Sequence, residues 1–172
     1  MEDQDFQTKL RAAEKSEANV GAAMARKFNC SLTFPTKNDR SKWDYTLVNL
    51  QQGRAVSIEQ KDSDKSKLCI ELERKTKSGI QPGYFHTCKA QKLCWVSHTE
   101  EKVYLYDWSA LKDYVIFLQD EDLLDLKDYT SNNEIWNHDS SPTSFCLIDF
   151  EDSIQALGSN NVSVYSFKDL NL

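Results

Sequence analysis

The feature that most constrains the fold is the segment 68–75, in which apolar residues at positions 68, 70 and 72 alternate with charged residues at positions 71 and 73. Successive residues of a β-strand point to opposite faces, so the pattern predicts a strand with one buried face. The buried face would consist of Leu68, Ile70 and Leu72. The opposite face would carry Glu71, Glu73 and Lys75. Such a charged face is unusual for a strand whose other residues are apolar.

A second apolar segment, Trp43–Val48, carries an acid at its start, Asp44. If the two segments form neighbouring strands, Asp44 lies close to Glu71 and Glu73. Carboxylate oxygens are the ligands that a hard divalent cation prefers, and a bound cation can activate water. The two segments together therefore predict a metal-assisted hydrolytic site.

Periodicity and turn residues outline the remaining elements. They predict a helix over residues 5–28, strands at 30–34, 43–50, 54–60 and 68–75, a short helix or turn at 84–92, a strand pair at 93–97 and 102–106, a helix from Ser109 to Leu118, and further strands at 144–148 and 162–167. This order indicates an α/β or α+β fold with a mixed central β-sheet flanked by helices. We expect one domain, residues 1–172, because this length leaves little room for two.

Composition narrows the class of protein. No apolar run approaches the length of a membrane span, and the polar start of the chain lacks the apolar core of a secretory signal. The five cysteines are odd in number and lack zinc-type spacing. We therefore expect an intracellular protein with reduced cysteines that does not contact a membrane.

Charge is distributed unevenly along the chain, whose net charge is −6. Basic residues concentrate between residues 37 and 92, whereas the part after residue 118 is strongly acidic. We expect a core over about residues 5–118 and an acidic C-terminal extension over about 119–172. The basic part could form a groove for a polyanion while the acidic part faces away, or both could be ordinary solvated faces.

Over roughly residues 5–118 the chain resembles the PD-(D/E)xK nuclease superfamily, which has the restriction-endonuclease-like fold. In that superfamily one acid opens the second core strand, and an acid–x–acid or acid–x–Lys pattern follows on the third. Asp44 matches the first acid. Glu71 with Glu73, or Glu73 with Lys75, matches the second pattern, and residues 51–67 would then form an added hairpin.

The resemblance implies a metal-dependent endonuclease of phage or mobile-element type that hydrolyses DNA phosphodiester bonds. It implies Mg²⁺ or Mn²⁺ as cofactor, held by Asp44, Glu71 and Glu73, with Glu17 as an outer ligand from the first helix. Lys75 would orient water or hold a phosphate oxygen. The expected contacts to the nucleic-acid backbone are Lys37, Arg40, Lys42, Lys89 and Lys92. A homodimer would allow both strands to be cut.

Three alternatives stay open. Glu71, Glu73 and Lys75 could form the solvent face of an edge strand with cross-strand ion pairs. The chain could be a binding or regulatory protein that keeps the nuclease fold with a degenerate site. The same carboxylates could also cleave RNA instead of DNA.

Overall fold

The computed structural model describes residues 2–36, 42–76, 78–128 and 140–172. The helices are α1 (Glu2–Phe28), α2 (Tyr84–Thr87), α3 (Trp108–Asp120), α4 (Phe150–Leu157) and α5 (Phe167–Leu170). The strands are β1 (Ser31–Thr33), β2 (Tyr45–Asn49), β3 (Arg54–Ser63), β4 (Lys67–Thr76), β5 (Gly79–Pro82), β6 (Lys92–Ser97), β7 (Lys102–Asp107), β8 (Asp125–Asp128), β9 (Ser140–Asp149) and β10 (Val162–Ser166).

The strands form two sheets. The central sheet has the order β1-β2-β3-β6-β7-β10, in which β3 and β6 are parallel and the other neighbours antiparallel. The expected α/β architecture, a mixed central sheet flanked by helices, is confirmed. The segment expected to be an added hairpin is different, because its strand β3 lies between β2 and β6 and so belongs to the core of the sheet.

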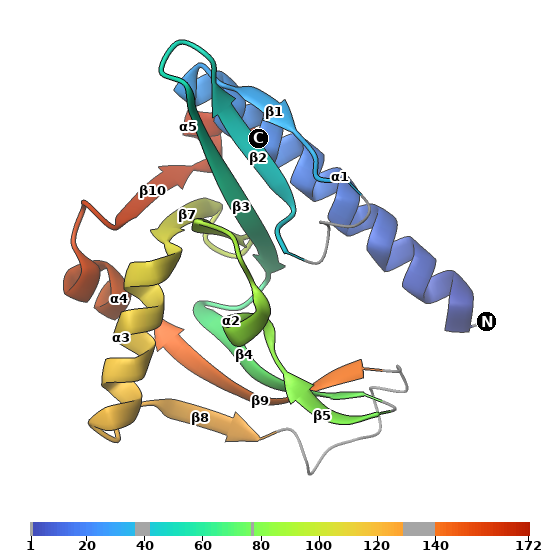
Figure 1. Ribbon diagram of the computed structural model, residues 1–172, viewed down its shortest axis with the longest axis vertical. Coiled ribbons are helices and arrows are strands. Elements are labelled where there is room, and N and C mark those ends of the chain that lie inside the picture. The colour runs from blue at the N-terminus through green and yellow to red at the C-terminus, as the bar shows by residue number, and fades with distance from the viewer. Residues whose placement is uncertain (1, 37–41, 77, 129–139) are drawn as a thin grey trace.

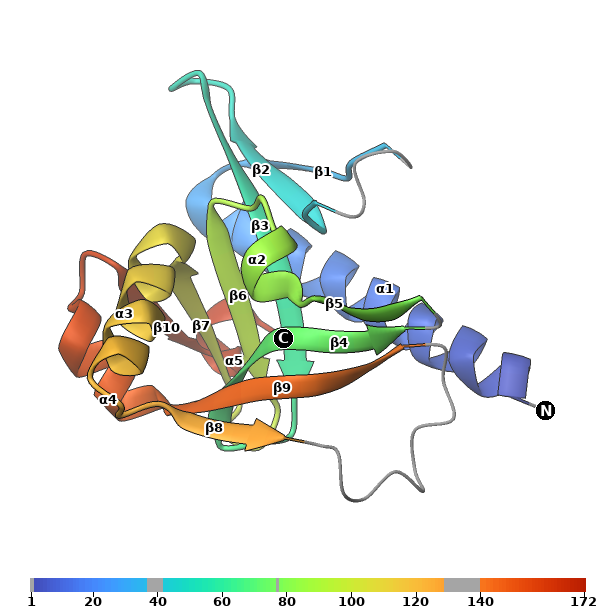
Figure 2. The same cartoon turned by 60° about the horizontal axis from the view of Figure 1, so that its bottom comes forward.

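The second sheet has the order β5-β4-β9-β8 and lies beside the central one (Figure 2). The expectation that the strand of Asp44 neighbours the strand of Glu71 and Glu73 is wrong, because β2 pairs with β1 and β3 whereas β4 pairs with β5 and β9. After β3, residues 64–66 lead the chain into the second sheet. There β4 finds its main partner in β9, which is distant in the sequence.

Helix α1 covers one face of the central sheet (Figure 1). Its buried side chains, such as Val20 and Met24, pack against Tyr45 and Ile58 of β2 and β3. The helix ends where Asn29 adopts a left-handed conformation (φ 53°) and the N–H of Cys30 bonds to the carbonyl oxygen of Ala25 at 2.8 Å. The turn after α1 returns the chain to the sheet as β1.

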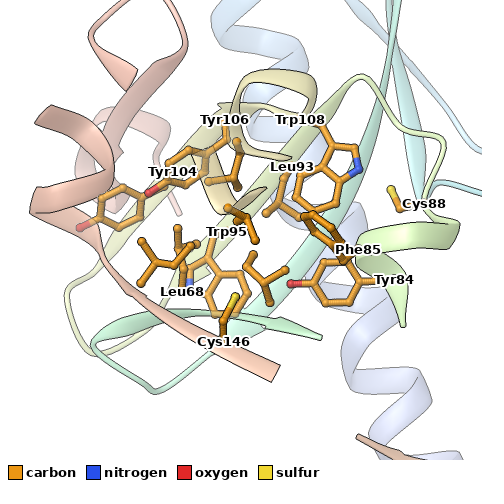
Figure 3. Close-up of a cluster of buried hydrophobic side chains, with 14 of the residues drawn as sticks. Leu68, Tyr84, Phe85, Cys88, Leu93, Trp95, Tyr104, Tyr106, Trp108 and Cys146 are labelled. Carbon is orange, nitrogen blue, oxygen red and sulfur yellow. The ribbon is translucent and has the colours of Figure 1, made fainter. Parts of the chain in front are cut away.

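The second sheet, α2 and α3 cover the opposite face of the central sheet. Figure 3 shows Leu93 and Trp95 of β6 among side chains from α2, α3 and the second sheet. Trp108, at the start of α3, packs with Tyr84 at 5.9 Å between ring centroids. This apolar layer makes the two sheets one packed unit.

Most predicted elements are confirmed within a few residues, including α1 and the antiparallel pair β6 and β7. The helix expected from Ser109 begins one residue earlier, at Trp108, because Asp107 caps α3 by accepting the N–H of Ala110 at 3.1 Å. The acidic C-terminal part supplies β10 to the central sheet and β9 to the second. No helix in the described part of the chain is long and apolar enough to cross a membrane.

Gly83 offers a test of how closely α2 approaches β4. A Cβ atom at this position would lie 2.5 Å from the backbone carbonyl oxygen of Glu71. We expect Gly83→Ala to destabilise the fold by about 1–3 kcal/mol, because overpacked backbone has little room to move. Thermal unfolding measures this loss. Gly53→Asn is the control, since Gly53 sits in open space at φ 61°, a conformation that Asn tolerates. An unchanged midpoint for Gly83→Ala would contradict this close approach.

Candidate active site

Asp44 lies at the point where β2 begins, and β3 holds it in place. Its backbone N–H bonds to the carbonyl oxygen of Ile58 at 2.9 Å. Its carboxylate accepts the backbone N–H of Gln60 at 2.6 Å. Two hydrogen bonds to β3 therefore fix both the main chain and the side chain of this acid.

Glu59 and Lys61 flank Gln60 on β3 and point to the opposite face of the sheet from Gln60. They are in register with Leu93 and Trp95 of β6, so they face the layer formed by the second sheet and α2. The two side chains form an ion pair. The side chain of Glu59 is 12% exposed and that of Lys61 is 33% exposed. The ammonium group of Lys61 also lies 5.1 Å from the ring centroid of Tyr84.

Glu17 joins this group from α1. Burial, followed by repulsion from the carboxylate of Asp44, raises the pKa of Glu17 to about 7. Lys61 opposes this change, and Asp62 and Glu59 add to it. The helix therefore brings a third carboxylate into the electrostatic field of Asp44 and Glu59.

The pKa values of Asp44 and Lys61 are also raised by their surroundings. Burial, and then the carboxylate of Glu59, raises the pKa of Asp44 to about 6, although Lys61 and the N–H of Gln60 oppose the shift. Burial lowers the pKa of Lys61, but Glu59 and Asp44 outweigh burial and the net pKa is raised. The site thus holds more negative charge than its one lysine balances, which favours a cation.

A hollow opens beside these carboxylates. It has a volume of about 410 Å³ and lies between α1 and the segment that leads into β2. Its lining residues are Leu10, Glu14, Glu17, Phe34, Trp43 and Asp44. A small polar ligand can therefore reach the carboxylates of Glu17 and Asp44.

The structure does not bring the acids predicted on β4 into this group. Glu71 forms an ion pair with Arg74 at 2.6 Å and accepts the N–H of Tyr84 at 3.3 Å. Glu73 is exposed on β4 opposite Pro82 of β5. The side chain of Lys75 lies outside the described residues. A catalytic role for Glu71, Glu73 and Lys75 depended on β4 lying next to β2. Since the two strands lie in different sheets, such a role is no longer supported.

The predicted basic contacts fall into three groups. Lys42 and Lys89 lie together near the start of β2, because the N–H of Lys89 bonds to the carbonyl oxygen of Lys42 at 3.0 Å. Lys92 forms an ion pair with Asp107 at 3.2 Å and shares the sheet face of Ile58, the face away from Glu59 and Lys61. Lys37 and Arg40 lie outside the described residues.

The sequence reasoning missed Glu59 and Lys61, although a signal was present. Residues 54–60 were expected to form a strand, and Glu59-Gln60-Lys61 has the same acid–x–Lys form as Glu73-Arg74-Lys75. The turn at Gly53 (φ 61°) joins β2 directly to β3 and makes β3 the neighbour of Asp44. A short turn predicts that the two strands it joins are neighbours. This criterion favours Glu59-x-Lys61, whose strand follows β2 after a short turn, over Glu73-x-Lys75.

Asp44, Glu59 and Glu17 fit a hard divalent cation by the chemistry of their donor atoms, since all three offer carboxylate oxygens. Within the described part of the chain, no three acidic, histidine or cysteine side chains converge into a complete ligand set. Magnesium usually takes one or two protein carboxylates and fills its other positions with water and phosphate oxygens. Asp44 and Glu59 are sufficient for that mode of binding.

Comparison with solved structures finds a similarity to a bacterial homing endonuclease, I-Ssp6803I. The match has a TM-score of 0.43 and 16% sequence identity, and it covers 60% of this chain and 72% of that one. No model of a protein family matches the chain, and no curated protein matches its sequence. The assignment of the site depends on the geometry of α1, β2 and β3.

Glu17→Gln should stabilise the metal-free protein at pH 8. The ionised form of Glu17 is disfavoured in the fold, so its penalty is present above pH 7 and fades as the pH falls toward the unfolded value of 4.5. We expect a gain on the order of 1 kcal/mol at pH 8 and none near pH 4. Thermal unfolding between these pH values measures it, with Asp113→Asn on the exposed side of α3 as the control. An equal gain at both pH values would contradict the assignment.

Proposed function

We propose that this protein is a metal-dependent nuclease that hydrolyses phosphodiester bonds of DNA. The observation that carries the proposal is the placement of Asp44 at the start of β2 beside Glu59-x-Lys61 on β3. This is the order of acids and lysine that the PD-(D/E)xK pattern requires, now on strands that are neighbours. Glu17 of α1 adds a third carboxylate, as the resemblance implies.

Asp44 and Glu59 would hold Mg²⁺ or Mn²⁺, and Glu17 would contribute through a bound water or as a further ligand. The cation would neutralise charge on the scissile phosphate and lower the pKa of a water molecule. Asp44 is held for this role, because the N–H of Gln60 bonds to one of its carboxylate oxygens and fixes the direction of the side chain. Burial, and then repulsion between carboxylates, raises the pKa of Asp44 and Glu17, and a bound cation would relieve the repulsion.

Lys61 would act as a fixed positive charge and not as a base. Its pKa is raised, so its ammonium group keeps its proton at neutral pH. Such a group can hold a phosphate oxygen or orient water as charge develops. The ion pair with Glu59 and the ring of Tyr84 hold the lysine on the site face of β3.

Lys42 and Lys89 would contact the nucleic-acid backbone, because their backbone hydrogen bond places both at the approach to Asp44. Contacts of this kind supply much of nucleic-acid affinity and weaken with salt. The predicted roles of Lys37 and Arg40, which precede Lys42, stay predictions. Lys92 is not part of the proposed surface.

Asp44→Asn, Glu59→Gln and Lys61→Met should each lower cleavage by at least about 100-fold, because each removes a metal ligand or the fixed charge. Glu73→Gln on β4 is the matched control and should retain activity. The assay offers Mg²⁺ or Mn²⁺ with supercoiled, linear, branched and single-stranded DNA and with RNA. Conversion of supercoiled DNA to linear product would indicate that both strands are cut.

Failure to cleave any DNA substrate with either metal would contradict the proposal. Cleavage of RNA alone would replace the substrate class and keep the site. An inactive Glu73→Gln variant with an active Glu59→Gln variant would move the site to β4.

A further inference from the structure

We propose that Gln60 is a positioning residue whose side chain ties together the three elements that carry the site. The inference rests on the proposed function, since it assigns a role to the residue between Glu59 and Lys61. Gln60 is only 4% exposed and lies on the face of β3 that packs against α1. Its apolar neighbour on that face is Ile58, so an aliphatic side chain would suit the position by burial alone.

The side chain of Gln60 makes three hydrogen bonds to three different partners. Its carbonyl oxygen Oε1 accepts from the hydroxyl of Tyr45 at 3.2 Å. Its amide nitrogen Nε2 donates to Ser16 Oγ at 3.1 Å and to Asp62 Oδ2 at 3.1 Å. Ser16 Oγ in turn donates to Asp62 Oδ1 at 2.7 Å, which closes a ring of hydrogen bonds.

Each segment that Gln60 touches carries a site residue next to the contact. Ser16 precedes Glu17 on α1, and Tyr45 follows Asp44 at the start of β2. Gln60 itself separates Glu59 from Lys61, and its backbone N–H bonds to the carboxylate of Asp44. One residue therefore holds the chain beside every charged group of the site.

Hydrogen bonds are suited to positioning α1, β2 and β3 relative to one another, because they depend on both direction and distance. Apolar contacts depend less on direction. A buried polar network is stable only when its members are satisfied, and then it specifies one arrangement. Both polar atoms of the Gln60 amide have partners. An aliphatic residue would fill the space, but it would remove the bonds from Gln60 to Tyr45 and Ser16 and leave Ser16 tied to β3 through Asp62 alone among the hydrogen bonds of the described residues.

The test compares Gln60→Met and Tyr45→Phe with Tyr106→Phe. Tyr106 is the matched control, because it is also a buried tyrosine whose hydroxyl contacts a buried polar side chain, Ser153, at 2.9 Å. Three quantities are measured: kcat and KM for DNA, Mn²⁺ affinity by calorimetry without DNA, and hydrogen exchange of the amides at residues 15–18 and 44–46.

We expect Gln60→Met to lower kcat and Mn²⁺ affinity by about 10–100-fold while KM for DNA stays unchanged. Tyr45→Phe, which removes one of the bonds, should have a smaller effect in the same direction. Exchange should accelerate at residues 15–18 and 44–46 in both variants. Tyr106→Phe should keep kcat, even where it lowers the unfolding temperature as much as Tyr45→Phe.

Retention of kcat and Mn²⁺ affinity in Gln60→Met and Tyr45→Phe would overturn the inference and leave the nuclease proposal intact. If the wild-type protein neither cleaves DNA nor binds Mn²⁺, the nuclease proposal fails and hydrogen exchange alone decides. Faster exchange confined to the two segments would then support the positioning role. Unchanged exchange would overturn it. If Gln60→Met does not fold, Tyr45→Phe and Ser16→Ala replace it under the same criteria.

Discussion

The hydrogen bond from the backbone of Gln60 to the carboxylate of Asp44 is the contact on which the site depends. At the end of the ladder between β2 and β3, a side-chain oxygen takes the place of a backbone carbonyl as the acceptor. This charge-assisted bond favours the ionised form of Asp44, although burial and the neighbouring Glu59 outweigh it and raise the pKa of Asp44 to about 6. The strand pairing thereby keeps a carboxylate where it would otherwise be unfavourable, and Lys61 offsets part of the cost.

The central sheet and α1 supply the charged residues around this bond, and the second sheet supports them. The central sheet supplies Asp44, Glu59 and Lys61, and α1 supplies Glu17 from the opposite face. The second sheet packs on the other side and fixes α2, since the hydroxyl of Tyr84 bonds to the carbonyl oxygen of Cys69 on β4. The ring of Tyr84 then lies against the ammonium group of Lys61. The strand expected to carry the site thus supports it from a neighbouring layer.

Local signals in the sequence predicted most of the fold. Helical spacing indicated α1, alternation indicated β4, and a charged turn between two apolar segments indicated the pair β6–β7. Of the four residues in the proposed site, the sequence pointed to Asp44 and Glu17 but not to Glu59 and Lys61. Both β3 and β4 carry an acid–x–Lys pattern, and choosing between them requires the partners of β4. Its main partner β9 follows it by about seventy residues, and no local pattern reports such pairing. The short β2–β3 turn was the accessible clue.

The most direct test of this account is a crystal structure with Mn²⁺, in which anomalous scattering locates the cation. The account predicts a peak within coordination distance of the carboxylates of Asp44 and Glu59, on the side of β3 that carries Lys61. A peak at Glu71 or Glu73 on β4, or full Mn²⁺ occupancy elsewhere with the Asp44 and Glu59 carboxylates unligated, would contradict it.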